Sequence, residues 1–216
     1  MTQVTNPTQP ASSLAGGVGG GGFTVIGTQE SNRLNGGPGS DIIQTFAAAD
    51  VIAGGSGNEL IISGGGNDSV GGGDGNDSLY GGKDNDTVNG GAGNDFISGD
   101  RGSDVLTGGD GSDTFYFFSS GGDYGVDTIT DFTPGTDKIR LKQGGVFAGL
   151  GSTFEATEFV VLAGFNAASP GTATTNKLVY DPTNGALYFN GTNGVLTVAQ
   201  LQPGLTTITS NSFELF

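Results

Sequence analysis

The sequence contains no histidine and no cysteine among its 216 residues. Catalysis by a Ser-His-Asp or Cys-His arrangement is therefore excluded, as are disulfide bonds, histidine-ligated zinc or iron, and zinc protease sites of the HExxH type. Basic residues are also scarce, 7 against 22 acidic ones, which gives a formal net charge of −15. A surface of that sign argues against nucleic acid as a partner.

Long apolar runs are missing as well. No stretch approaches the ~20 apolar residues needed to cross a bilayer, so no transmembrane segment is expected. The N-terminus lacks the basic start and apolar run of an ordinary signal peptide. Residues 1–26 are rich in Thr, Pro, Ser and Gly, a composition that predicts a flexible leader.

The chain is rich in glycine, with 44 residues, and it has an excess of carboxylates. The net charge opposes compaction unless cations neutralise it. Hard cations such as calcium are bound by carboxylate and backbone carbonyl oxygens. Composition alone leaves two interpretations equally open, a calcium-binding protein and an ordinary acidic surface.

A nine-residue repeat decides between them. From Gly36 to Tyr116 the sequence divides into consecutive nonapeptides without insertion or deletion, and GTQESNRLN from Gly27 fits as a degenerate forerunner. Most units read Gly-Gly-x-Gly-x-Asp-x-apolar-x. The eighth position is apolar in every unit: Ile43, Ile52, Ile61, Val70, Leu79, Val88, Ile97, Leu106 and Phe115. A low-complexity linker needs no such constant phase.

This pattern predicts a six-residue turn followed by a three-residue strand whose apolar residue points inward. Two units form one coil, so residues eighteen apart lie above one another. The sixth-position acids then form two columns, one of Asp41, Glu59, Asp77, Asp95 and Asp113 and one of Asp50, Asp68, Asp86 and Asp104. Carboxylates stacked at about 4.8 Å repel each other, which favours cations lodged between successive turns.

The nonapeptides resemble the RTX, or hemolysin-type, calcium-binding repeats. The resemblance implies an all-β fold with a right-handed parallel β-roll at 27–116, which holds several Ca²⁺ ions between loops two repeats apart. It implies carboxylate ligands at Asp41, Glu59, Asp68, Asp77, Asp86, Asp95, Asp104 and Asp113. It also implies carbonyl ligands at Gly72, Asp74, Gly81, Lys83, Gly90, Ala92, Gly99 and Arg101, with the charged ends of Lys83 and Arg101 in water.

Some units depart from the pattern. The unit beginning at Thr45 has no glycine, Glu59 replaces aspartate, and Asp84 and Asp100 occupy glycine positions. Aspartate tolerates left-handed backbone better than most residues. The TFAAAD loop is expected to lack the carbonyl nest of the other turns and to act as an N-terminal cap.

Residues 117–216 are expected to form an antiparallel β cap. Gly125–Leu141 resembles the segment after the repeats in serralysin-type proteases, with a strand at Asp127–Phe132 and a return strand at Asp137–Leu141. Whether Asp127 and Asp131 bind metal or belong to an ordinary acidic hairpin stays open. Lys177–Leu201 resembles the late hairpin of the family, although Asn190 and Asn193 stand where relatives often carry aspartate.

The ending, residues 207–216, is similar to the uncleaved C-terminal signals of proteins that leave Gram-negative cells through a one-step, ATP-driven type I exporter. Together with the repeats, it predicts a secreted, extracellular protein.

The predicted function is a calcium-binding RTX protein that folds on calcium binding outside the cell and has a non-catalytic surface or matrix role. The alternative is a calcium-dependent polysaccharide-binding or accessory module of an extracellular enzyme, because relatives attach such repeats to proteases, lipases and alginate epimerases. A glycosidase needs only two carboxylates across a cleft, but the unassigned acids Glu155, Glu158, Asp181 and Glu214 are scattered.

Overall fold

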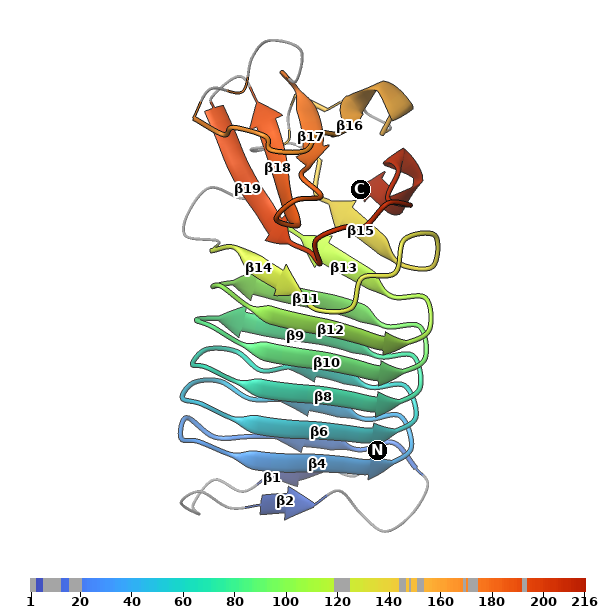
Figure 1. Cartoon of the computed structure of the whole chain (residues 1–216). Helices are drawn as coiled ribbons and strands as arrows, with labels where there is room; N and C mark the ends of the chain where they lie inside the picture. The colour runs from blue at the N-terminus through green and yellow to red at the C-terminus, as the bar shows by residue number, and fades with distance from the viewer. Residues whose placement is uncertain are drawn as a thin grey trace.

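The computed structural model describes residues 3–5, 13–15, 21–118, 125–143, 147, 149–150, 154–168, 170, 175–191 and 194–216. It is a stack of coils formed by two parallel sheets, with an antiparallel segment toward the C-terminus (Figure 1). The expected class, an all-β parallel roll followed by antiparallel β-structure, is confirmed.

Each coil contributes one strand to each sheet. The nine-stranded sheet runs β1 (Gln3–Thr5), β3 (Thr24–Ile26), β5 (Ile42–Gln44), β7 (Leu60–Ile62), β9 (Ser78–Lys83), β11 (Phe96–Arg101), β13 (Thr114–Phe117), β15 (Lys138–Leu141) and β20 (Phe213–Leu215). The eleven-stranded sheet runs β16 (Phe159–Val161), β17 (Lys177–Tyr180), β18 (Ala186–Gly191), β19 (Gly194–Gln200), β14 (Asp127–Ile129), β12 (Val105–Asp110), β10 (Thr87–Ala92), β8 (Ser69–Asp74), β6 (Val51–Ser56), β4 (Arg33–Pro38) and β2 (Ser13–Ala15).

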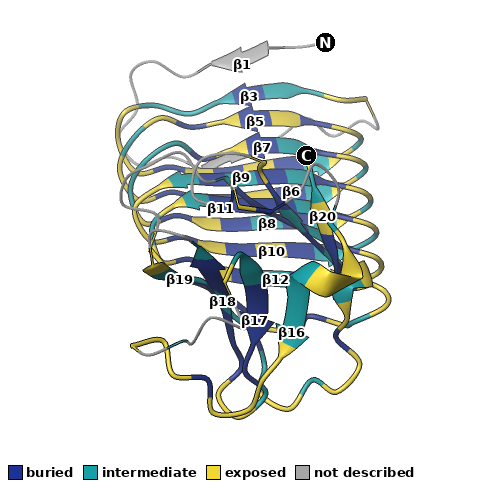
Figure 2. Cartoon of the chain, turned by 90° about the horizontal axis from the view of Figure 1, so that it is seen from above, coloured by how far each residue is buried: buried dark blue, intermediate teal, exposed yellow. Residues whose placement is uncertain are grey.

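The eighth-position side chains form the core of the roll. Leu79 pairs in register with Ile61 on one side and Ile97 on the other, and all three are fully buried. Buried positions line up from strand to strand across the stack (Figure 2). One inward apolar side chain per unit is therefore enough to build a continuous, narrow interior.

Most strands within the roll are longer than the pattern predicts. In β8 and β10 the repeat glycines also pair, Gly73 with Gly91, so these strands run for six residues and the turns shorten. Gly73 lies against the Gly55 carbonyl of the preceding coil with φ of 116°, a conformation that only glycine adopts easily. The glycines thus join coils to one another and do not merely form loops.

The coils continue beyond Tyr116. Strands β14 and β15 pair in parallel with β12 and β13, so they lie in opposite sheets as a further coil. Strands form at both expected places, although β14 ends at Ile129 and not at the expected Phe132. They are not the two arms of a hairpin, because each adds to a different sheet of the roll. At the other end, β3 lies within the expected leader and pairs with β5.

The expected antiparallel β-structure is formed by β17, β18 and β19, whereas β15, β16 and β20 in the same C-terminal region pair in parallel. Strand β19 pairs in parallel with β14, which joins the cap to the roll. Buried Asp181 accepts N–H groups from Gly164, Phe165 and Thr183, so one carboxylate fixes the loop beside β17. Asn193 lies outside the described residues.

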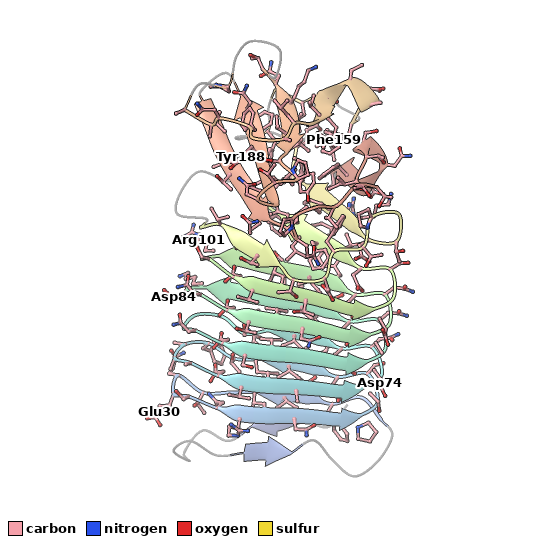
Figure 3. The ribbon with its side chains drawn as sticks, in the orientation of Figure 1. Glu30, Asp74, Asp84, Arg101, Phe159 and Tyr188 are labelled. Carbon is pink, nitrogen blue, oxygen red and sulfur yellow. The ribbon has the colours of Figure 1, made fainter. Side chains whose placement is uncertain are left out.

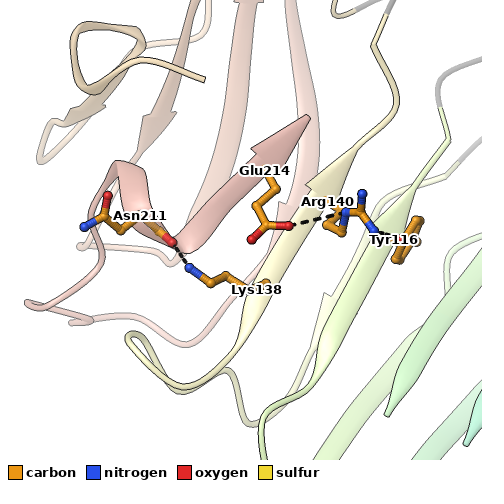
Figure 4. Close-up of polar contacts among 5 residues, drawn as sticks. All are labelled: Tyr116, Lys138, Arg140, Asn211 and Glu214. Carbon is orange, nitrogen blue, oxygen red and sulfur yellow. Dashed lines mark hydrogen bonds and ion pairs between the residues drawn. The ribbon is translucent and has the colours of Figure 1, made fainter. Parts of the chain in front are cut away.

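The chain end is docked on the roll through β20 and β15 (Figure 4). Arg140 Nε lies 3.5 Å from Glu214 Oε2, and its guanidinium lies over the rings of Tyr116 and Phe216. Lys138 donates to the Asn211 carbonyl. No helix in the described part of the chain has the length and apolar character needed to cross a membrane.

Candidate metal sites at the coil turns

The sixth-position carboxylates lie at the two edges of the stack, where one sheet passes into the other. All nine are only 1–3% exposed. The two predicted columns are formed by residues eighteen apart, as the contacts of Asp77 with Glu59 and of Asp86 with Asp68 show. Figure 3 labels Asp74 and Asp84, which belong to the turns at the two opposite edges. Glu59 keeps the place of an aspartate in its column.

One oxygen of each aspartate in the columns joins successive coils, whereas neither carboxylate oxygen of Glu59 has a hydrogen-bond partner in the described structure. Asp77 Oδ1 accepts the N–H of Glu59 at 2.8 Å, and Asp86 Oδ1 accepts the N–H of Asp68 at 2.8 Å. The same contact repeats along both columns at 2.6–2.9 Å. The acids therefore have a structural role in addition to any metal binding.

The second oxygen has no such partner. The buried atoms without a hydrogen-bond partner in the described part of the chain include Oδ2 of Asp41, Asp50, Asp68, Asp77, Asp86, Asp95, Asp104 and Asp113, and both carboxylate oxygens of Glu59. A buried carboxylate oxygen without a donor is costly, so a repeated row of them is suited to binding a cation.

Backbone carbonyls converge on the same places. A Cβ atom placed on Gly72 would lie against Asp77 Oδ2 and 2.6 Å from the Gly90 carbonyl oxygen. At the other edge, a Cβ on Gly81 would lie 2.5 Å from Asp86 Oδ2 and 2.9 Å from the Gly99 carbonyl. The first-position glycines thus leave open small cradles bounded by a carboxylate and by a carbonyl of the next coil.

The third-position carbonyls lie beside these cradles and are partly used. Asp74 and Ala92 accept the N–H groups of Gly57 and Gly75, and Lys83 accepts that of Gly66 at 3.2 Å. Arg101 pairs in register with Lys83. A carbonyl oxygen has two lone pairs, so one hydrogen bond leaves each able to bind a cation.

This donor set fits calcium. Within the described residues, no three acidic side chains gather at one point. A cation at the turns would therefore draw on main-chain carbonyls as well as carboxylates, which is the all-oxygen set that calcium accepts in flexible geometry.

Burial without a counter-charge disfavours ionisation of these acids. It raises the pKa of Asp86 and of Glu59 to about 8, and the pKa values of Asp68, Asp95 and Asp104 to about 6. The negative charge of stacked neighbours adds to the effect, for example Asp104 and Asp68 on Asp86. The columns are therefore poised to take up a positive charge.

Two acids beyond the repeats extend the columns. Asp127 accepts the N–H of Asp104, and Asp137 accepts that of Asp113, both at 3.1 Å. Burial raises the pKa of Asp127 to about 8. Asp131 instead accepts the N–H groups of Gly108 and Gly109, so it caps a turn. Asp137 was not predicted as a site residue because it lies after the break in the period.

A second ladder at the fifth position was also not predicted. Asn76 Oδ1 accepts the N–H of Asn94, and Asn58 Oδ1 accepts that of Asn76. Asn67 and Asn85 act in the same way at the other edge. The signal was present in the sequence, since this position is Asn or Ser in every unit except the one with Ala49.

The atypical units keep their place in the stack. Asp84 and Asp100 adopt φ of 73° and 67°, so aspartate takes the left-handed backbone that glycine supplies elsewhere. In the TFAAAD loop Ala48 does so with φ of 68°. Asp50 still accepts the N–H of Asn32. The reduced carbonyl nest of this loop stays a prediction.

One comparison with known proteins, that with family models, agrees with this geometry. The model of the RTX calcium-binding nonapeptide repeat matches four times, at residues 26–61, 53–88, 62–97 and 89–117. No curated protein matches the sequence. Among solved structures, the extracellular lipase LipA from Serratia marcescens is similar at 17% identity with a TM-score of 0.32; the match covers 97% of this chain but 41% of the lipase chain. This protein therefore carries RTX calcium-binding nonapeptide repeats, which form its parallel β-roll.

Proposed function

We propose that this chain is a secreted protein whose roll folds when calcium enters the turns and which has a non-catalytic role at a surface or in a matrix. One observation carries the proposal: two columns of buried carboxylates in which each aspartate has one hydrogen-bonded oxygen and one oxygen without a donor in the described structure. Neutralising these columns converts repulsion between coils into cross-linking.

The proposed calcium ligands are of two kinds, side-chain carboxylates and backbone carbonyls. The strongest carboxylate ligands for calcium are Asp68, Asp77, Asp86, Asp95, Asp104 and Asp113. Two further ligands, Asp41 and Glu59, lie in the units on either side of the atypical unit that begins at Thr45. The carbonyls of Gly72, Asp74, Gly90 and Ala92 complete sites at one edge. Those of Gly81, Lys83, Gly99 and Arg101 do so at the other.

The charge of the chain supports a folding switch. A chain of net charge −15 with a narrow core stays extended when calcium is scarce, which suits passage through a type I exporter. Extracellular calcium modules bind at about 10⁻⁴ to 10⁻³ M, so the switch would act between cytosolic and external concentrations.

Far-UV circular dichroism during a calcium titration tests the proposal, with magnesium as the control. A cooperative gain of β signal with calcium alone is the expected result. A roll that stays fully folded in chelator, or that responds equally to magnesium, contradicts it.

A further inference from the structure

A groove lies at one edge of the stack, over the ends of strands β9 and β11 of the nine-stranded sheet. Its volume is about 510 Å³, and its walls include Tyr80, Lys83, Asp100, Arg101, Phe118 and Lys142. A second hollow of about 390 Å³ shares Lys83 and Arg101 with it. Figure 3 shows both Asp84 and Arg101 at this edge, with Arg101 at the top of the roll next to the cap and Asp84 below it. The two hollows together make a shallow track along the coils.

The groove is open because its floor contains glycines, which have no side chain to fill it. Gly64 and Gly82 hold φ of 95° and 105° at the second position, where Asp100 stands one coil further on. The floor is therefore bare backbone. Phe118 and Lys142 enter from the coils after the repeats, and Lys142 Nζ lies 5.7 Å from the centre of the Phe118 ring.

The charge of the groove is opposite to that of the protein. Lys83, Arg101 and Lys142 are three of the seven basic residues in a chain of net charge −15. The three cations outnumber the acids that line the two hollows: Asp100, which accepts the Ser98 hydroxyl at 2.7 Å, lies in the first, and Asp84, which accepts the N–H of Gly66 at 3.1 Å, lies in the second. Cations gathered at one place on such a surface favour an anionic ligand.

The aromatic rings narrow the choice of ligand. Tyr80 packs on Phe96, with ring centres 5.9 Å apart, and Phe118 packs on Phe216 at 5.7 Å, so both groove rings are held in place. Fixed ring faces beside cations suit the apolar face of a sugar that carries a carboxylate. Successive coils are about 4.8 Å apart, a spacing comparable to the length of one pyranose unit.

We infer that this groove binds an acidic oligosaccharide of the uronate type, with sugar rings on Tyr80 and Phe118 and carboxylates at Lys83 and Lys142. Because the coils that carry these residues are held by the acidic turns, the inference rests on the proposed calcium-dependent fold. In this proposal calcium stabilises the roll and does not bridge to the ligand, whereas the two lysines contact the carboxylates of the sugar.

The test is isothermal titration of a short oligouronate into the full chain at saturating calcium. The double variant Lys83→Gln, Lys142→Gln is compared with Arg33→Gln, Lys177→Gln, which removes the same charge away from the groove. Losing two charge-assisted contacts lowers affinity by about tenfold or more in the first variant, while the control stays within about twofold of the parent chain. Tyr80→Leu weakens binding as well.

Two results would contradict oligouronate binding in the groove: equal affinity of the two double variants, or equal binding of a neutral oligosaccharide of the same length. Circular dichroism of the same samples separates this failure from that of the proposed function. A chain that folds on calcium but binds no oligouronate refutes the groove alone. A chain that is folded without calcium refutes calcium-dependent folding. The comparison of the two double variants then still tests whether the groove binds the oligouronate.

Discussion

Asp77 Oδ1 accepts the backbone N–H of Glu59 at 2.8 Å, whereas Asp77 Oδ2 has no donor within the described structure. The two oxygens of one side chain therefore serve different purposes, one in joining coils and the other in facing the cradle beside Gly72. An asparagine at this position keeps the first contact and loses the negative charge.

Asp77→Asn separates these roles. Its amide oxygen retains the hydrogen bond to Glu59, but one charged ligand is lost, so the calcium midpoint rises by on the order of tenfold. A calcium titration followed by circular dichroism measures this. Asp110→Asn, an exposed acid at the same edge, is the control and leaves the midpoint unchanged. Equal midpoints for both variants would argue against ligation by Asp77.

Gly72→Ala tests the cradle itself. The added methyl group would collide with Asp77 Oδ2 and the Gly90 carbonyl, so we expect weaker calcium binding and a loss of about 2 kcal/mol in the free energy of unfolding. At the adjacent Gly71 the nearest atom to an added methyl is the Ile52 carbonyl oxygen at 3.9 Å, so Gly71→Ala is tolerated. Urea unfolding at saturating calcium compares the two.

Acid should partly replace calcium. The pKa values of Asp86 and Glu59 rise to about 8 in the fold, against ordinary values of 3.8 and 4.5, because burial disfavours the charged form. The folded chain then holds more protons than the unfolded one, so this stability is fully present below about pH 4 and is lost progressively as the pH rises from there to about 8.

The check is circular dichroism in chelator across this pH range. More β-structure at pH 5 than at pH 8 is expected, together with weaker calcium binding at the lower pH. A metal-free chain that gains structure as pH rises would contradict the burial of these acids.

Ile61 and Ile62 form a natural pair for testing the core. Ile61 is fully buried and Ile62 is 38% exposed on the outer face. Ile61→Ala should cost about 2–5 kcal/mol in the free energy of unfolding through its cavity, whereas Ile62→Ala should cost well under half as much. Urea denaturation in calcium gives both values, and similar losses would mean that the single inward row does not dominate stability.

Much of the fold could be predicted because the period is strict. The eighth-position residues predict the core, and the sixth-position acids predict both columns, from Asp41 to Asp113. The strand length could not be read in the same way, since the pairing of Gly73 with Gly91 depends on hydrogen bonds between coils rather than on side-chain pattern.

The site could be predicted less completely than the fold. Asp127 and Asp137 continue the columns only because β14 and β15 add another coil after a stretch that breaks the period. The groove is beyond sequence reasoning for a similar reason. Tyr80 and Lys142 are far apart in the chain and meet only through the order of strands in the sheet.

The eighteen-residue register of the regular coils has a consequence for the length of the molecule. Each regular coil pairs with its neighbours in the same way, Val70 with both Ile52 and Val88, so a duplication or deletion of one coil leaves every remaining contact type intact. The distance between the first strands and the antiparallel cap would then change in fixed steps of about 4.8 Å. The protein can therefore be lengthened or shortened by whole coils, without redesign of the first strands or of the cap.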